Sequence, residues 1–174
     1  AARLVAAAHA NDISGSIRIP AAHCGLVGLK PSRGRTIASI ASDAKTGMNA
    51  EGVVTRSVRD TAGLLDAISV SGSLLLLPAA GQPCPSLRVG LCTQAFSGSS
   101  VDPANASVAE HCASLLEGLG CSVEISSPAP LSDPALWKAA ATLLAVSVAV
   151  EVDVWSAKIG RELGENDLEA MTWR

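Results

Sequence analysis

Residues 11–35 place a serine-rich turn between an acid and an arginine, in the stretch NDISGSIRIPAAHCGLVGLKPSRGR. Ser16 follows Gly15, lies four positions after Asp12 and stands two positions before Arg18. A serine hydroxyl in such a turn is a candidate nucleophile, although it is weak at neutral pH and needs activation. Ser-Gly-Ser is equally typical of an ordinary turn, and an Asp–Arg pair can simply fix a loop. The turn alone leaves both interpretations open.

The segments on either side of the turn must position it. Residues 1–10 have an alanine-rich pattern that predicts a helix. After the turn, Ser16 and Arg18 alternate with isoleucines, so the two polar side chains share a face if this segment is extended. The run 25–29 is too short and glycine-rich to assign. Residues 36–52 form a long polar connection, which often belongs to a binding surface.

A capping box and a linker follow. Ser57 and Asp60 predict a helix that begins after Ser57 and ends near Ser69. Residues 71–86 contain Gly, Ser and three prolines, a composition typical of a linker. The sequence is therefore expected to divide at this stretch.

Residues 87–174 carry a strand–helix–strand pattern. The apolar run 87–92 and the alternating run 121–126 predict strands. Residues 102–120 predict a helix, which Asp-Pro opens and Gly ends. This order indicates a right-handed βαβ crossover with a parallel strand pair. The fold class is therefore α/β.

A second Asp-Pro pair, at Asp133, predicts the start of another long helix. That helix contains the most apolar stretch of the chain, residues 139–150, which Lys138 and Glu151 flank. The stretch is shorter than a bilayer span, so we expect a buried helix and no membrane partner.

The composition restricts the classes of function. A chain of 174 residues with 48% hydrophobic and 17% charged residues is globular and can bury a core. Its net charge is −3 and it has three Trp, one Phe and no Tyr, so the basic footprint and stacking platform of a nucleic-acid binder are missing. Five cysteines without a C-x-x-C pair fit neither a disulfide framework nor a zinc site. We expect no metal, no nucleic-acid partner and a reducing cytoplasmic location.

Four stretches carry a family resemblance. DISGSIRIPAAHCGLVGLKPSRGR and the later GVVTRSVRDTAGLLDAI resemble the second half of the amidase signature, the motif of the serine hydrolases called amidase signature enzymes. LRVGL and LEGLGCSVEISSP resemble the segment that follows the signature in the same family. The resemblance implies an α/β fold with a mixed β-sheet core surrounded by α-helices.

The resemblance also predicts the organisation of the chain. Residues 1–174 are expected to form a single incomplete amidase domain, because neither end carries its own start or stop signal. Within it, 1–70 form the second half of the signature, 71–86 a linker, and 87–174 the βαβ unit plus C-terminal helices.

Individual roles follow from the resemblance. Ser16 matches the nucleophile, and Asp12 with Arg18 matches an ion pair that supports the loop without doing chemistry. The oxyanion hole is expected to consist of four consecutive backbone N–H groups, those of Ile13, Ser14, Gly15 and Ser16. The family usually has glycine where this chain has Ser14, so a positive φ at that position would strain the serine.

The activating groups of the family have no match here. Family members activate the serine through a second serine, held by a cis peptide, and a neutral lysine. Both match sequence upstream of Ala1, whereas Lys30 matches a structural position. Because these two groups have no match, we expect at most trace activity from this fragment alone. The resemblance itself implies an enzyme without a cofactor.

The resemblance implies an amidohydrolase acting on linear or cyclic amides. It would convert a small-molecule carboxylic amide into a carboxylate plus ammonia or an amine. One alternative is the glutaminase subunit of a tRNA-dependent amidotransferase, although its usual Gln after the arginine is Ile19 here. Another is a catalytically dead fragment or interaction module. The exact substrate and the oligomeric state stay open, with a homodimer of the full-length enzyme as one option.

Overall fold

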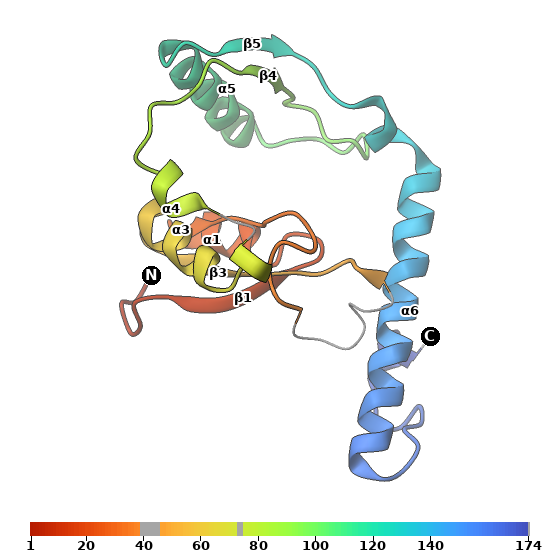
Figure 1. Ribbon diagram of the computed structural model, residues 1–174. Coiled ribbons are helices and arrows are strands. Elements are labelled where there is room, and N and C mark those ends of the chain that lie inside the picture. The colour runs from red at the N-terminus through yellow and green to blue at the C-terminus, as the bar shows by residue number, and fades with distance from the viewer. Residues whose placement is uncertain (39–45, 73–74, 174) are drawn as a thin grey trace. The chain divides into compact units, whose positions relative to one another are not determined.

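The computed structural model describes residues 1–38, 46–72 and 75–173 and divides into two compact units (Figure 1). The first unit comprises residues 1–81 together with 141–174, and the second comprises residues 82–140. Parts of the predicted polar connection (39–45) and of the predicted linker (73–74) lie outside the described residues. The rest of the linker includes a short helix, α4 (Leu76–Ala79), so it is not structureless.

A three-stranded antiparallel sheet forms the centre of the first unit. Its strands are β1 (Ala8–Asp12), β2 (Val27–Gly28) and β3 (Ala50–Thr55), in the order β1-β3-β2. In the register of β1 with β3, Ala8 lies opposite Val54 and Asp12 lies opposite Ala50. The central strand β3 is buried along most of its length, so it anchors the end of β1 from which the serine turn leaves.

Two predictions near the N-terminus are wrong. Residues 1–10 are not a helix, because the segment from Ala8 onward pairs with β3. The ladder supplies inter-strand hydrogen bonds and packing, and these outweigh the small helix preference of alanine. Ser16 and Arg18 do not share an extended face, because the chain turns at Ser16 and helix α1 (Arg18–Cys24) begins at Arg18.

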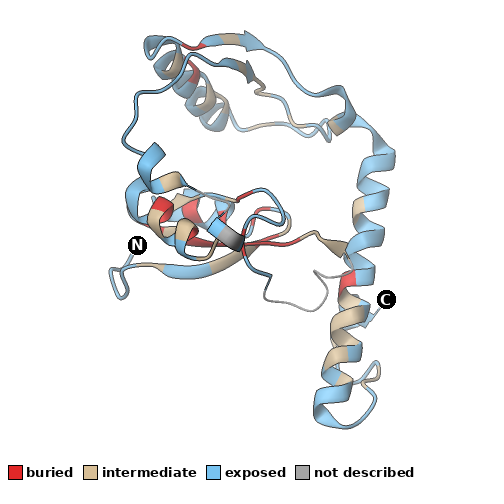
Figure 2. Ribbon diagram, viewed as in Figure 1, coloured by how far each residue is buried: buried red, intermediate tan, exposed pale blue. Residues whose placement is uncertain are grey.

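Helix α3 (Val58–Ala67) confirms the predicted N-cap at Ser57, although the N–H of Ser57 donates to the Thr55 hydroxyl at 3.3 Å and not to Asp60, so the box is only half formed. The Ser57 hydroxyl accepts a hydrogen bond from the backbone N–H of Asp60 at 3.1 Å, and the helix ends close to the expected position. The helix packs on β3, where Leu65 and Val53 form the buried hydrophobic cluster of the unit. Figure 2 shows buried residues gathered on this sheet and helix.

The second unit confirms the strand–helix–strand prediction. Strands β4 (Arg88–Leu91) and β5 (Ser122–Ile125) pair in parallel, and helix α5 (Pro103–Gly118) connects and contacts them. The Asp102 carboxylate accepts a hydrogen bond from the N–H of Ala104 at 2.8 Å, as its predicted N-cap role requires. The α/β class is therefore correct.

Helix α6 (Pro134–Ile159) begins where the sequence predicts, and the Asp133 carboxylate accepts from the N–H of Ala135 at 2.9 Å. The prediction of a buried helix is wrong for the described chain, because Ser147 is the one buried residue among those described in α6 (Figure 2). The helix also extends well beyond 139–150. Among the described residues it is the one helix long and apolar enough to cross a bilayer, by length and composition only. The remaining short elements are η1 (Val70–Gly72), η2 (Ala129–Ser132) and α7 (Ala170–Trp173).

Candidate active site

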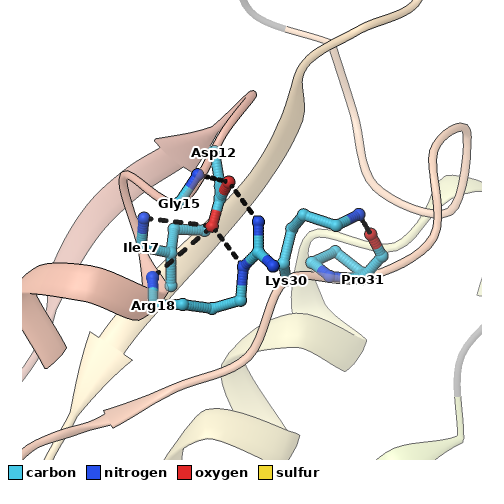
Figure 3. A network of polar contacts seen from close by, with 6 residues as sticks. All are labelled: Asp12, Gly15, Ile17, Arg18, Lys30 and Pro31. Carbon is cyan, nitrogen blue, oxygen red and sulfur yellow. Dashed lines mark hydrogen bonds and ion pairs between the residues drawn. The ribbon is translucent and has the colours of Figure 1, made fainter. Parts of the chain in front are cut away.

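The carboxylate of Asp12 binds several backbone amides of the serine turn (Figure 3). Its side chain is 0% exposed and lies at the end of β1. Oδ1 accepts the backbone N–H of Gly15 at 2.6 Å, and Oδ2 accepts those of Ile17 at 3.2 Å and Arg18 at 3.4 Å. A buried acceptor that binds several amides of one turn fixes their directions.

Arg18 completes this arrangement with its side chain. Its Nε lies 2.8 Å from Asp12 Oδ2 and its Nη2 lies 2.9 Å from Oδ1, a bidentate pair. The Arg18 hydrogen bonds, followed by those from the Gly15 and Ile17 amides, outweigh burial and hold the pKa of Asp12 well below its usual range. Asp12 in turn raises the pKa of Arg18. Because the Arg18 side chain is 52% exposed, water reaches the outer side of the pair.

Gly15 gives the turn its shape. Its φ is +133°, a conformation that residues with a side chain rarely adopt, and an added Cβ would lie 2.5 Å from Ile19 Cδ1. Among the described residues other than glycine, only Arg3 has a positive φ. Ser14 therefore occupies an ordinary backbone conformation, and its presence in place of glycine does not strain the turn.

Ile17 anchors the other side of the turn and was missed by the sequence analysis. Its side chain is 0% exposed and reaches over the sheet. A Cβ on Gly52 in β3 would lie 2.8 Å from Ile17 Cδ1, and one on Gly28 in β2 would lie 2.6 Å from the Cβ of Ala21 and 3.1 Å from Ile17 Cγ2. The two strand glycines thus make room for the isoleucine. Their placement inside strands was the signal for this close approach.

Ser16 lies exposed between two buried neighbours, Gly15 and Ile17. The structure brings all the site residues expected from the sequence into this one turn. The family resemblance places the Gly15 N–H in the oxyanion hole. In the structure this N–H donates to Asp12 instead. For the N–H groups of Ile13, Ser14 and Ser16, the described residues provide no hydrogen-bond acceptor. The turn thus presents an accessible hydroxyl and three amide donors on a fixed backbone.

An apolar pocket of about 330 Å³ lies beside the turn, within the first unit. Ile13 contributes to its wall from the turn, and α6 contributes most of the rest. The α6 residues that line it include Leu144, Val148, Glu151, Val152 and Trp155. Such a cavity suits an apolar group with few polar atoms.

Lys30 does not approach the turn as a base would. Its Nζ donates a hydrogen bond to the carbonyl of the adjacent Pro31 at 2.7 Å (Figure 3). In the described part of the chain, no group of three or more His, Cys, Asp or Glu residues is placed to hold a metal ion.

Comparison with known proteins identifies the family. The family model described as amidase matches residues 1–173. The chain belongs to the amidase signature family. This amidase-family chain is 40% identical over 187 aligned residues to a 6-aminohexanoate-cyclic-dimer hydrolase of Paenarthrobacter ureafaciens, covering 99% of the chain and 38% of that relative. The chain therefore spans little more than a third of the length of this curated relative.

Two further comparisons agree with this membership. A lipoamidase of Enterococcus faecalis is 33% identical over 174 residues, covering 99% of the chain and 23% of that protein. A solved structure of 6-aminohexanoate cyclic dimer hydrolase with substrate is 36% identical and superposes with a TM-score of 0.86, covering 98% of this chain and 38% of that one. The expected family and fold class are thereby confirmed.

Proposed function

We propose that the whole protein is a serine amidase that forms an acyl-enzyme on Ser16. The Ser16 hydroxyl attacks the amide carbonyl, ammonia or an amine leaves, and water then releases the carboxylate. The observation that carries this proposal is an exposed serine between two buried residues, on a turn whose backbone a buried carboxylate holds. A nucleophile must be accessible while the groups around it are preorganised.

The oxyanion would be bound by the N–H groups of Ile13, Ser14 and Ser16. Gly15 is left out of this set, because its N–H is directed to Asp12 at 2.6 Å. The ion pair of Asp12 with Arg18 would act only by fixing the directions of the donors. Removing one such donor typically lowers kcat by about 10²–10³-fold.

Activation of Ser16 needs a base that the described turn does not supply. The family resemblance implies a second serine and a neutral lysine. This chain covers 38% of its 6-aminohexanoate-cyclic-dimer hydrolase relative, and we place both groups in the part of the whole protein that it does not cover. The 174 residues alone are then expected to hydrolyse amides at no more than a trace rate.

The substrate is proposed to be an amide with an aliphatic acyl chain. The pocket beside Ile13 is apolar, and its volume of about 330 Å³ can hold such a chain. Two relatives are named 6-aminohexanoate-cyclic-dimer hydrolase and lipoamidase, and the acyl groups in both names are aliphatic. Glutamine, the substrate of the glutaminase alternative, would find few partners for its polar groups, because the accessible surface of these walls is almost entirely apolar.

The test uses the whole protein and a serine-directed fluorophosphonate. Trypsin releases residues 4–18, whose two serines are Ser14 and Ser16. We expect the label on this peptide in wild type and in Ser14→Ala. Ser16→Ala should lose both the label and the hydrolysis of hexanamide. The unfolding temperature should be unchanged in Ser16→Ala, because the side chain is exposed. Labelling of Ser16→Ala on the same peptide would contradict the assignment.

The activity assay separates the alternatives. Hydrolysis of hexanamide above that of glutamine supports the aliphatic substrate class, and the reverse preference supports the glutaminase. A whole protein that neither reacts with the fluorophosphonate nor hydrolyses either amide would be a catalytically dead member of the family.

A further inference from the structure

Two cysteines in the second unit face each other across the start of its parallel strand pair. The Sγ atoms of Cys84 and Cys121 lie 4.0 Å apart although the residues are 37 positions apart in sequence. Cys121 is buried and Cys84 is exposed. Both thiols point to the same carbonyl, that of Pro85, at 3.8 Å from Cys121 Sγ and 3.5 Å from Cys84 Sγ.

Hydrogen bonds next to the thiols hold the two segments side by side. The Ser86 hydroxyl donates to the carbonyl of Gly120 at 2.9 Å, and the N–H of Ser122 donates to the carbonyl of Leu87 at 2.8 Å. These bonds continue directly into the β4–β5 ladder, whose first pair is Arg88 with Ser122. The closeness of the sulfurs thus follows from the strand register.

We propose that Cys84 and Cys121 form a reversible disulfide, a redox modification site that ties the segment before β4 to the residue before β5. The oxidant is a low-molecular-weight disulfide such as oxidised glutathione. A bonded pair of sulfurs is about 2.05 Å apart, so the two thiols must approach by roughly 2 Å. Residues 82–87 have no helix or strand structure that would resist this movement.

The reaction proceeds by two thiol–disulfide exchanges. The Cys84 thiolate attacks one sulfur of the small disulfide, forms a mixed disulfide and expels one small thiolate. The Cys121 thiolate then attacks the Cys84 sulfur, which forms the protein disulfide and expels the second small thiolate. The two protons lost by the cysteines are taken up by the expelled thiolates. The protein is oxidised by two electrons, and the small disulfide is reduced to two thiols.

The environment of Cys84 sets the speed of the first step. Its hydrogen bond with Cys121 raises the pKa of the Cys84 thiol, so little thiolate is present at neutral pH. Oxidation should accelerate as the pH rises. In a reducing compartment the bond would form transiently, as is usual for redox-sensing pairs there.

The disulfide would close a loop that contains β4 and α5. Such a cross-link stabilises mainly by restricting the unfolded chain. We therefore expect the oxidised second unit to unfold at a higher temperature than the reduced one. This effect is independent of the proposed amidase chemistry at Ser16, which belongs to the first unit.

The experiment incubates the whole protein with oxidised glutathione at mildly alkaline pH and blocks the remaining thiols. Digestion with trypsin and a glutamyl endopeptidase separates the cysteines of this part of the chain onto different peptides. These peptides span residues 60–88 with Cys84, 89–110 with Cys92, 111–117 with Cys112, and 118–124 with Cys121. Mass spectrometry then identifies which peptides are linked.

We expect one linked pair, 60–88 with 118–124, in wild type and in the control Cys112→Ser, and none in Cys84→Ser. Cys84→Ser is the informative variant because its side chain is exposed and its replacement leaves the core intact. Oxidation should raise the unfolding temperature in wild type but not in Cys84→Ser, and a thiol reductant should reverse the increase.

Three results would overturn the proposal. Linkage of Cys84 to Cys92 or Cys112 in comparable yield would indicate non-specific oxidation. A folded protein that forms no linked pair, under conditions in which the same protein in urea does, would show that the thiols cannot approach. Equal or lower stability of the cross-linked protein would refute the expected effect on the second unit.

Discussion

Apolar side chains of the serine turn and of helix α6 are buried to very different extents. Around the turn, Ile17 is 0% exposed and packs over glycines of two strands, whereas Leu143 on α6 is 41% exposed. The apolar residues of α6 are spread around its circumference. A helix of that kind is normally covered on all sides by protein or lipid. Burial therefore depends on whether a partner surface is present as well as on residue type.

The amidase-family relatives suggest which surface is missing. The chain spans 38% of the length of its 6-aminohexanoate-cyclic-dimer hydrolase relative. We therefore expect other segments of the whole protein to cover α6. The variants below test the contrast between the turn and the helix, beginning with the largest effect.

Replacing Asp12 by Ala should have the largest effect on stability. The change removes a fully buried carboxylate and leaves the amides of Gly15 and Ile17 without their acceptor. Each buried N–H that loses its acceptor costs about 1–3 kcal/mol of unfolding free energy, and the remaining Arg18 charge adds little because its side chain is 52% exposed. Urea unfolding followed by circular dichroism measures this cost. Asp60→Ala, which removes an exposed acid from the same unit, is the control and should cost well under half as much.

Truncating one apolar side chain in each region tests the contrast directly. Ile17→Ala should cost about 2–5 kcal/mol because it opens a cavity under the turn. Leu143→Ala should change the unfolding free energy of this chain by less than about 0.5 kcal/mol. In the whole protein the cost of Leu143→Ala should rise. Equal costs of the two variants in this chain would show that α6 is already packed.

Acidification should weaken the turn region through Asp12. Because the folded state lowers the pKa of Asp12, its charge stabilises the fold at pH values above its ordinary pKa of 3.8. This stability should be lost as the pH falls below 3.8 toward the lowered pKa. Asp12→Asn removes the titrating group, so its urea midpoint should fall less between about pH 6 and pH 3. Parallel midpoint curves for wild type and Asp12→Asn would contradict the assignment.

The smallest difference concerns two helix N-caps. Ser57→Ala removes the cap of α3, which packs on the core, and should cost about 1 kcal/mol of unfolding free energy. Asp133→Ala removes the cap of α6, which is largely exposed in this chain. We expect the second change to lower helicity with little effect on the unfolding midpoint. Ser57→Thr keeps an acceptor oxygen and serves as the control. A midpoint shift of similar size in Asp133→Ala would weaken the contrast.

Local signals predicted several elements well. The capping residues Ser57, Asp102 and Asp133 located the starts of three helices, because each supplies a side-chain oxygen to an otherwise unpaired N–H. The alternating run that became β5 and the glycine that ends α5 were equally readable. The family resemblance placed the candidate nucleophile at Ser16, which the structure shows on an exposed turn.

Other features depended on segments far apart in the chain. Alanine-rich residues at the N-terminus suggested a helix, but pairing with β3, some forty residues later in sequence, made a strand of Ala8–Asp12. The alternation around Ser16 suggested an extended segment, but the Asp12 carboxylate bends the chain into a turn. Neither competing interaction is visible in a short window of sequence.

The sequence by itself determined the family, the α/β class and the residues of the serine turn, because these depend on local motifs and on side chains next to each other in the chain. Only the tertiary structure decided that Asp12 is buried, that Gly28 and Gly52 make room for Ile17, and that the Gly15 amide is directed to Asp12. The physical reason is that burial and hydrogen-bond direction depend on which strands pair. Strand pairing brings together residues separated by many positions in the chain.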